Sequence, residues 1–140
     1  MLLRARRLAL PALEKKGTTL LDDVAVPKPV LPAMMERIRR AGDRHGVLIG
    51  TFGHAGDGNL HPTIVFDGAN PDSRQRAVAA FDEILHGAAD LGGTITGEHG
   101  IGALKRGHAG LVIGDAERAL MARIKAAFDP SGILNPGKAF

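Results

Sequence analysis

Two glycine-rich segments of this chain carry residues whose types suit metal and acid–base chemistry. The first covers residues 53–61 and the second covers residues 97–102. Together they supply three imidazoles and two carboxylates: His54, His61, His99, Asp57 and Glu98. Imidazole nitrogens and carboxylate oxygens are the usual ligands of a catalytic divalent metal, and glycine leaves room around them. The segments predict one half of an active site, whose other half lies outside the chain.

The position of each candidate along the chain suggests its role. A tight turn between a strand ending at His54 and a strand beginning at His61 brings these two imidazoles together. Glu98 follows the last predicted strand at the same end of the sheet, and we assign it as the third ligand. Adjacent residues point in different directions, so His99 is assigned as the acid–base group. Two histidines and one carboxylate leave positions open for substrate and suit Zn, Fe or Mn.

Simpler interpretations of these residue types stay open. Asp57 lies between glycines and is explained by turn formation alone. The site histidines could also serve only to hydrogen-bond around tight turns. Three further histidines, His45, His86 and His108, lie near turns or on helical faces and are interpreted as surface or structural residues. Lys105 could reach the site from the loop after Gly102, but we favour a solvated side chain.

Hydrophobic periodicity and turn residues define the elements that must position these groups. Helices are predicted over residues 2–16, 31–44, 71–91 and 116–128. Strands are predicted over residues 20–26, 47–52, 61–66 and 94–96. Ser73 or Asp72 is the expected N-cap of the third helix, and Gly92 with Gly93 ends it.

From residue 20 to residue 96 the predicted order is strand, helix, strand, strand, helix, strand. This βαββαβ order indicates an α+β, ferredoxin-like antiparallel sheet with both helices on one face and the other face free to cover something. Residues 1–19 are expected to be a helical segment continuing from a missing upstream region. Residues 20–96 then form the ferredoxin-like cap, and residues 97–140 form a C-terminal helical tail.

Composition limits the class of protein. A chain of 140 residues with 44% hydrophobic residues suits one small globular domain. The net charge is +3, but acidic and basic residues are interleaved, so nucleic-acid binding is not expected. No segment approaches the roughly 20 apolar residues that span a membrane. The absence of cysteine is compatible with a reducing compartment, and we expect a cytoplasmic protein. A homo-oligomer is an open alternative.

Three motifs together resemble a known family. They are GHAGDGNLHP at residues 53–62, GGTITGEHGIG at residues 92–102, and FDPSGILNPGK at residues 128–138. In this order they are similar to the C-terminal domain of the FAD-linked oxidases, flavoproteins of the vanillyl-alcohol oxidase type. Within that family, the chain is most similar to the branch of the glycolate oxidase FAD-binding subunit and D-lactate dehydrogenase.

The resemblance implies a cap over the reactive face of FAD in an enzyme that oxidises a small 2-hydroxy acid. By resemblance, the metal ligands are His54, His61 and Glu98. The resemblance also implies that His99 is the catalytic base, that Arg6 binds the substrate carboxylate and that Asn135 returns to the flavin. The family's FAD-binding domain lies N-terminal to this cap, so the chain alone is expected to be inactive.

Two other classes of function remain as alternatives. A stand-alone metal- or metabolite-binding module is compatible with a ferredoxin-like sheet, because such sheets host many ligand sensors. A structural or assembly role would use the free sheet face for a partner. That role leaves the glycine and histidine motifs without an explanation, so it ranks last.

Overall fold

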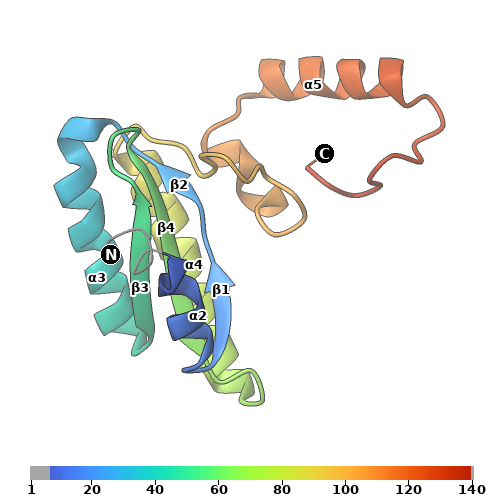
Figure 1. Ribbon diagram of the computed structural model, residues 1–140. Helices are drawn as coiled ribbons and strands as arrows, with labels where there is room; N and C mark the ends of the chain where they lie inside the picture. Colours follow the sequence, from blue (N-terminus) through green and yellow to red (C-terminus); the bar gives the residue numbers. More distant parts are fainter. Residues whose placement is uncertain (1–6, 140) are drawn as a thin grey trace.

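The computed structural model describes residues 7–139 and shows a sheet with helices on both faces, followed by a separate helical tail (Figure 1). The strands are β1 (Thr18–Leu21), β2 (Val24–Ala25), β3 (Leu48–His54) and β4 (Asn59–Phe66). The α-helices are α2 (Ala9–Glu14), α3 (Leu31–His45), α4 (Pro71–Asp90) and α5 (Asp115–Phe128). Two short 3-10 helices are η1 (Lys28–Val30) and η2 (Arg106–Leu111). The predicted α+β class with an antiparallel sheet is confirmed.

Strand β4 lies at the centre of the sheet and pairs antiparallel with β3 on one side and with β1 and β2 on the other. The single strand predicted over residues 20–26 is wrong in detail, because Asp22 and Asp23 interrupt it. The fourth predicted strand, residues 94–96, is reduced to one bridge between Ala25 and Thr94. With that bridge at the far edge, the spatial order of the strands is still that of a βαββαβ sheet.

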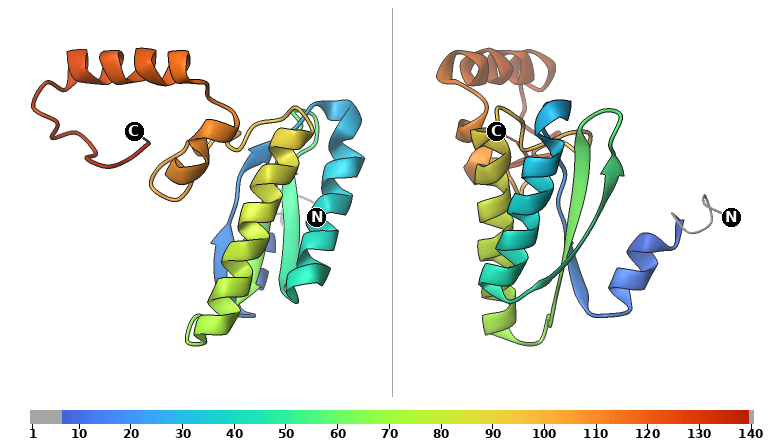
Figure 2. Two further views of the ribbon diagram at one scale, coloured as in Figure 1. Left: turned by 180° about the vertical axis from the view of Figure 1, so that it is seen from behind. Right: turned by 90° about the vertical axis from the view of Figure 1, so that its left-hand side faces the viewer.

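Helices α3 and α4 lie side by side on one face of the sheet (Figure 2). Their inner faces and the facing strand residues form the core, which includes Met34, Ile38, Phe81, Ile84, Leu60 and Ile64. Helix α3 ends where Gly46 adopts a left-handed φ of 61° and its N–H bonds back to the last turn. Burying a side chain as large as Phe81 contributes about 1.5–3 kcal/mol, so this layer stabilises the sheet that carries the candidate residues.

The N-cap of α4 differs from the prediction. Asn70, rather than Asp72 or Ser73, accepts hydrogen bonds at its side-chain oxygen from the N–H groups of Asp72 (3.0 Å) and Ser73 (3.3 Å). Ser73 is buried, and its hydroxyl instead accepts from the N–H of Asp67. The acid and the serine therefore belong to the first turn of the helix, and the cap lies one residue before Pro71.

Within the described part of the first predicted helix, α2 covers Ala9–Glu14 and ends two residues before the predicted end at residue 16, while residues 1–6 lie outside the described structure. Helix α2 lies on the sheet face opposite α3 and α4 (Figure 2). A Cβ added at Gly50 would come within 2.6 Å of the Leu13 side chain, so Leu13 of α2 packs directly over this glycine of β3 and would have to shift to admit a larger residue. The sheet face expected to be free is therefore partly covered.

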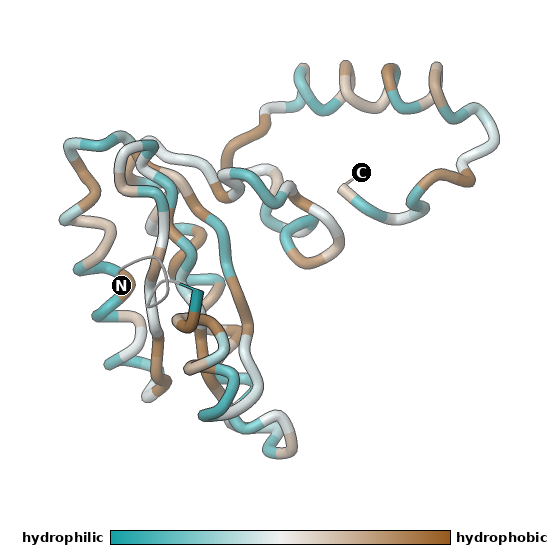
Figure 3. The backbone as a smooth tube through the Cα atoms, viewed as in Figure 1, coloured by the Kyte–Doolittle hydropathy of each residue, from teal (hydrophilic) through white to brown (hydrophobic). Residues whose placement is uncertain are grey.

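Helix α5 agrees with the predicted C-terminal helix, and none of its residues is buried. Hydrophobic residues recur along α5 and in the segment after it (Figure 3), where the most exposed are Phe128 and Ile133. Between residues 7 and 139, no helix combines the length and apolarity needed to cross a membrane.

Candidate metal centre

The β3–β4 hairpin brings two of the predicted ligands to the same face of the sheet. His54 pairs with Asn59 and Phe52 pairs with His61, so His54 and His61 are diagonal neighbours on the face opposite α3 and α4. The turn between the strands depends on Gly58, which has a φ of 77°. A Cβ at this position would lie 2.2 Å from the Val26 carbonyl oxygen, so only glycine suits the turn.

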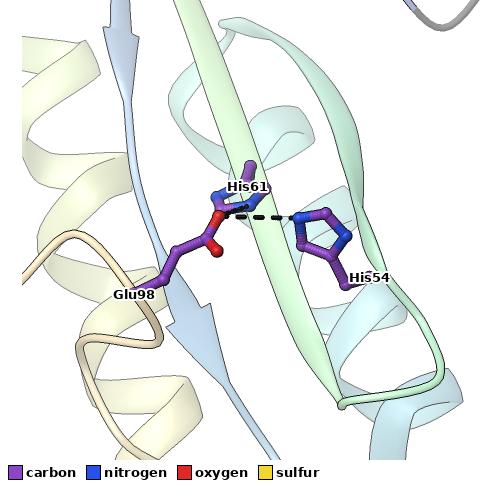
Figure 4. A group of neighbouring side chains, drawn as sticks. All are labelled: His54, His61 and Glu98. Carbon is purple, nitrogen blue, oxygen red and sulfur yellow. Dashed lines mark ion pairs between the residues drawn. The ribbon is translucent and has the colours of Figure 1, made fainter.

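Glu98 completes a cluster with these histidines (Figure 4). Its Oε1 atom lies 3.1 Å from His61 Nε2 and 3.5 Å from His54 Nε2. One ligand atom from each of the three residues lies within 4.8 Å of the others. The side chain of His61 is only 6% exposed, whereas those of His54 and Glu98 are 36% and 51% exposed. The cluster therefore has a buried base and an open front.

His99 lies beside this cluster. Its ring stacks on the His61 ring, with centroids 4.9 Å apart and an interplanar angle of 14°. Its Nε2 atom is 3.7 Å from Glu98 Oε1. The expectation that neighbouring Glu98 and His99 diverge is therefore not met, because both side chains reach the same cluster. Stacking leaves the edge of the His99 ring able to exchange a proton with a bound molecule.

Asp23 is a buried residue at this site that the sequence analysis does not single out. Its Oδ2 atom accepts hydrogen bonds from three consecutive backbone N–H groups, those of Gly97 (2.8 Å), Glu98 (2.8 Å) and His99 (2.7 Å). Burial alone raises the pKa of the Asp23 carboxyl, but these donors outweigh burial and lower its pKa below the ordinary value. The only feature of the sequence that could have indicated this role is that two acidic residues, Asp22 and Asp23, interrupt the strand predicted over residues 20–26.

Lys105 is not solvated, which corrects the favoured interpretation. It is 4% exposed, and its ammonium donates to the backbone carbonyls of Asp23 and Ile95 at 2.6 Å each. It also pairs with Asp22 Oδ1 at 2.7 Å. Burial raises the pKa of the Asp22 carboxyl, although the neighbouring Lys105 acts in the opposite direction. Lys105 therefore links the loop after Gly102 to the residues just before β2 through these hydrogen bonds and the ion pair.

Asn135 is not among the described residues of the cluster. Asn135 lies in the exposed segment after α5, where it adopts a left-handed φ of 47°, and Arg6 lies outside the described residues. Two of the other histidines contact carboxylates away from the cluster, His45 that of Glu83 at 2.9 Å and His108 that of Asp82 at 3.1 Å, in agreement with structural roles.

The chemistry of the cluster suits a divalent metal. Two imidazole nitrogens and one carboxylate oxygen converge there, which is the donor set of many open catalytic sites. Behind them, His61 Nδ1 and Asp23 Oδ1 are buried, face each other at 3.6 Å and have no hydrogen-bond partner among the described residues. A carboxylate behind the second ring nitrogen is the usual support of a metal-binding histidine. The residues present therefore fit such an ion.

Together, the fold and the cluster define an α+β domain that carries an open His–His–Glu centre with a further histidine beside it. The chain belongs to the family described as FAD linked oxidases, C-terminal domain, which it matches over residues 1–139. This match confirms the resemblance inferred from the three motifs.

Curated relatives agree with this assignment. The chain is 47% identical over 140 residues, 99% of its length, to the glycolate oxidase subunit GlcD of Bacillus subtilis. It is 40% identical over 83% of its length to GlcD of Escherichia coli K12. It is 36% identical over 85% of its length to the mitochondrial D-lactate dehydrogenase (cytochrome) of Arabidopsis thaliana. It spans only 30%, 23% and 21% of these proteins, respectively.

A solved structure shares the fold. The 4-ethylphenol oxidase of Gulosibacter chungangensis, in a complex with isoeugenol, aligns with 86% of this chain and 24% of its own at a TM-score of 0.60. The sequence identity is 22%, so this likeness supports the fold alone.

Proposed function

We propose that this chain is the substrate-side cap domain of an FAD-dependent oxidoreductase that converts glycolate or D-lactate to the corresponding 2-oxo acid. The observation that carries the proposal is the convergence of His54, His61 and Glu98 within 4.8 Å, with His99 stacked beside them. The names of two relatives, a glycolate oxidase subunit and a D-lactate dehydrogenase, support the substrate class. FAD supplies the acceptor for the hydride that leaves the substrate Cα.

In this proposal His54 Nε2, His61 Nε2 and a Glu98 carboxylate oxygen hold a divalent metal. When bound, such an ion supplies Lewis acidity that lowers the pKa of the substrate hydroxyl. His99 accepts the hydroxyl proton at Nε2, and its stacking on the buried ring of His61 holds the plane of its own ring.

Two further assignments rest on the family resemblance. Arg6 binds the substrate carboxylate, for which a guanidinium offers two parallel hydrogen bonds. Asn135 contacts the flavin. Loss of the hydroxyl proton and of the hydride at Cα together turn the 2-hydroxy acid into a 2-oxo acid, while FAD is reduced.

The exposed apolar residues of α5 are an argument that this helix packs against a second domain. Leu120, Ile124 and Phe128 recur at helical spacing on α5 and are 49%, 50% and 81% exposed. Side chains of this size rarely stay exposed together in an isolated domain. We propose that α5 packs against the domain that binds FAD, which accords with the greater length of the relatives.

Metal titration of the 140-residue chain tests the centre directly. We expect about one equivalent of Zn or Mn to bind to the wild-type chain, measured by calorimetry. His54→Ala and Glu98→Ala should each lose binding, because each removes one of three ligands. His86→Ala is the matched control, since it removes an exposed histidine outside the cluster. A wild-type chain that binds no metal, or ligand variants that bind like the control, would overturn the proposed metal role.

A further inference from the structure

Asp23 contacts both halves of the candidate centre. One of its oxygens accepts the N–H groups of the turn that carries Glu98 and His99, at 2.7–2.8 Å. The other lies 3.6 Å from His61 Nδ1. We propose that Asp23 is a positioning residue, which fixes the turn and holds the His61 ring in the tautomer with the proton on Nδ1. This inference rests on the proposed function, because it is the metal centre that Asp23 would position.

Sheet register explains why Asp23 faces His61. Leu21 pairs with Thr63 in the β1–β4 ladder, and Val24 pairs with Leu60 in the β2–β4 ladder. The same register continues across the two acids between them, which places Asp23 opposite His61. Residues opposite each other in antiparallel strands share a face of the sheet. The carboxylate is therefore delivered to the ring by strand pairing, not by a mobile loop.

The tautomer matters because only an unprotonated ring nitrogen can bind a metal. His61 turns Nε2 toward Glu98 Oε1, at 3.1 Å, and turns Nδ1 toward Asp23 Oδ1. In a neutral imidazole one nitrogen carries the proton, and the hydrogen bond made by that nitrogen decides which one it is. A carboxylate can only accept, so Asp23 Oδ1, which lies 3.6 Å from Nδ1, favours a proton on Nδ1 and leaves Nε2 free.

Asparagine could not replace Asp23 in this role, although it has nearly the same shape. If its amide oxygen faces the three N–H donors of the turn, its NH₂ group faces His61 Nδ1, which must then accept and leave the proton on Nε2. If the amide is reversed, its NH₂ group faces the three donors, and those hydrogen bonds are lost. Only a carboxylate offers acceptors on both sides.

The backbone of Asp23 is itself held on both sides. Its N–H donates to Asp22 Oδ1 at 2.7 Å, and its carbonyl accepts from Lys105 Nζ at 2.6 Å. Asp23 is 1% exposed, so water does not compete for its side chain. Gly97 adds a further constraint, since a Cβ there would lie 2.7 Å from Asp23 Oδ1. A rigid carboxylate with two defined targets is what a positioning residue requires.

The decisive measurement is the His61 tautomer, read from two-bond proton–nitrogen correlation spectra of the metal-free 140-residue chain at about pH 8.5, well above the usual His pKa of about 6.5. The background is Glu98→Ala, which removes the acceptor that competes for the proton on Nε2. We expect His61 to carry its proton on Nδ1 in that background, and to carry it on Nε2 once Asp23→Asn is added. A proton on Nε2 in the Glu98→Ala chain overturns the inference, even if the double variant does not fold.

Metal affinity is the second readout. With Glu98 intact, Asp23→Asn should weaken metal binding about 10–100-fold, the usual effect of losing such a supporting group. Asp129→Asn is the matched control, because Asp129 is also a buried carboxylate that accepts backbone N–H groups, those of Ile133 and Leu134, but lies after α5. Equal affinity in both variants overturns the inference. Absence of metal from the wild-type chain instead overturns the proposed metal role, a result distinct from the tautomer measurement.

Discussion

Replacement of Lys105 by methionine should destabilise the whole domain, because this buried cation has no substitute. Its ammonium joins Asp22 Oδ1 and two backbone carbonyls, all within 2.7 Å. Methionine keeps most of the apolar stem but removes the charge and all three hydrogen bonds. Asp22, which is 0% exposed, would then be a buried carboxylate without its cation.

Removing one partner of a buried ion pair costs about 3–5 kcal/mol. The carbonyls of Asp23 and Ile95 also lose their donor, but this loss is part of the same event and is not added. Total stability of a domain is about 5–15 kcal/mol, so Lys105→Met should remove a large share of it. The exposed Lys16 gives a matched control: Lys16→Met should change stability by less than about 0.5 kcal/mol.

Urea unfolding followed by circular dichroism measures this loss, since the chain has no Trp or Tyr to report by fluorescence. Adding Asp22→Asn to Lys105→Met should recover part of the stability, because the uncompensated charge is then absent. A Lys105→Met chain within about 1 kcal/mol of wild type would refute the structural role of the pair. A large loss that Asp22→Asn does not relieve would show that the charge on Asp22 is not its cause.

Three further results are expected. Because burial raises the pKa of Asp22, its carboxyl keeps a proton in the folded chain at pH values above the ordinary pKa of 3.8, where the unfolded chain has lost it. The contribution of Asp22 to the free energy of unfolding therefore falls as the pH rises through the folded-state pKa. In urea unfolding, the free energy of unfolding of Asp22→Asn minus that of wild type should therefore increase as the pH rises above the ordinary value of 3.8, and a constant difference would contradict this sign. Asn70→Ala should lower thermal stability by about 1 kcal/mol through loss of the α4 cap, whereas Asn70→Asp should retain it. In a flavin-loaded protein that contains this domain, His99→Asn should lower turnover about 10²–10⁴-fold with metal content unchanged, and near-normal turnover would exclude His99 as the base.

The elements that depend on nearby residues are predictable from the sequence. Helical spacing of Met34 and Ile38 locates α3, and glycines with Asp57 between them locate the β3–β4 turn. Once that hairpin is assigned, His54 and His61 must approach each other. The grouping of these histidines with Glu98 therefore follows from strand order and motif position, without knowledge of side-chain packing.

The buried charges are not predictable in this way, because their partners are distant in sequence. Asp23 bonds to the N–H of His99, 76 residues away, and receives the ammonium of Lys105 from 82 residues away. In the sequence, Asp22 and Asp23 are simply two acids in a predicted strand, and a lysine in a glycine-rich loop is most often solvated. Only the fold shows that these three charges meet in the interior behind the candidate centre.

The distribution of exposure across the centre indicates which side faces a partner. Asp23 and His61 lie at its base and are buried, while His54, His99 and Glu98 become progressively more exposed toward the front. The base is anchored to the sheet by strand register, by Lys105 and by the N–H groups of the 97–99 turn. A site rigid behind and open in front has the form of one wall of a cleft. Exclusion of water, on which strong electrostatic catalysis depends, would then require a second wall, the role that the proposed flavin-binding domain would have.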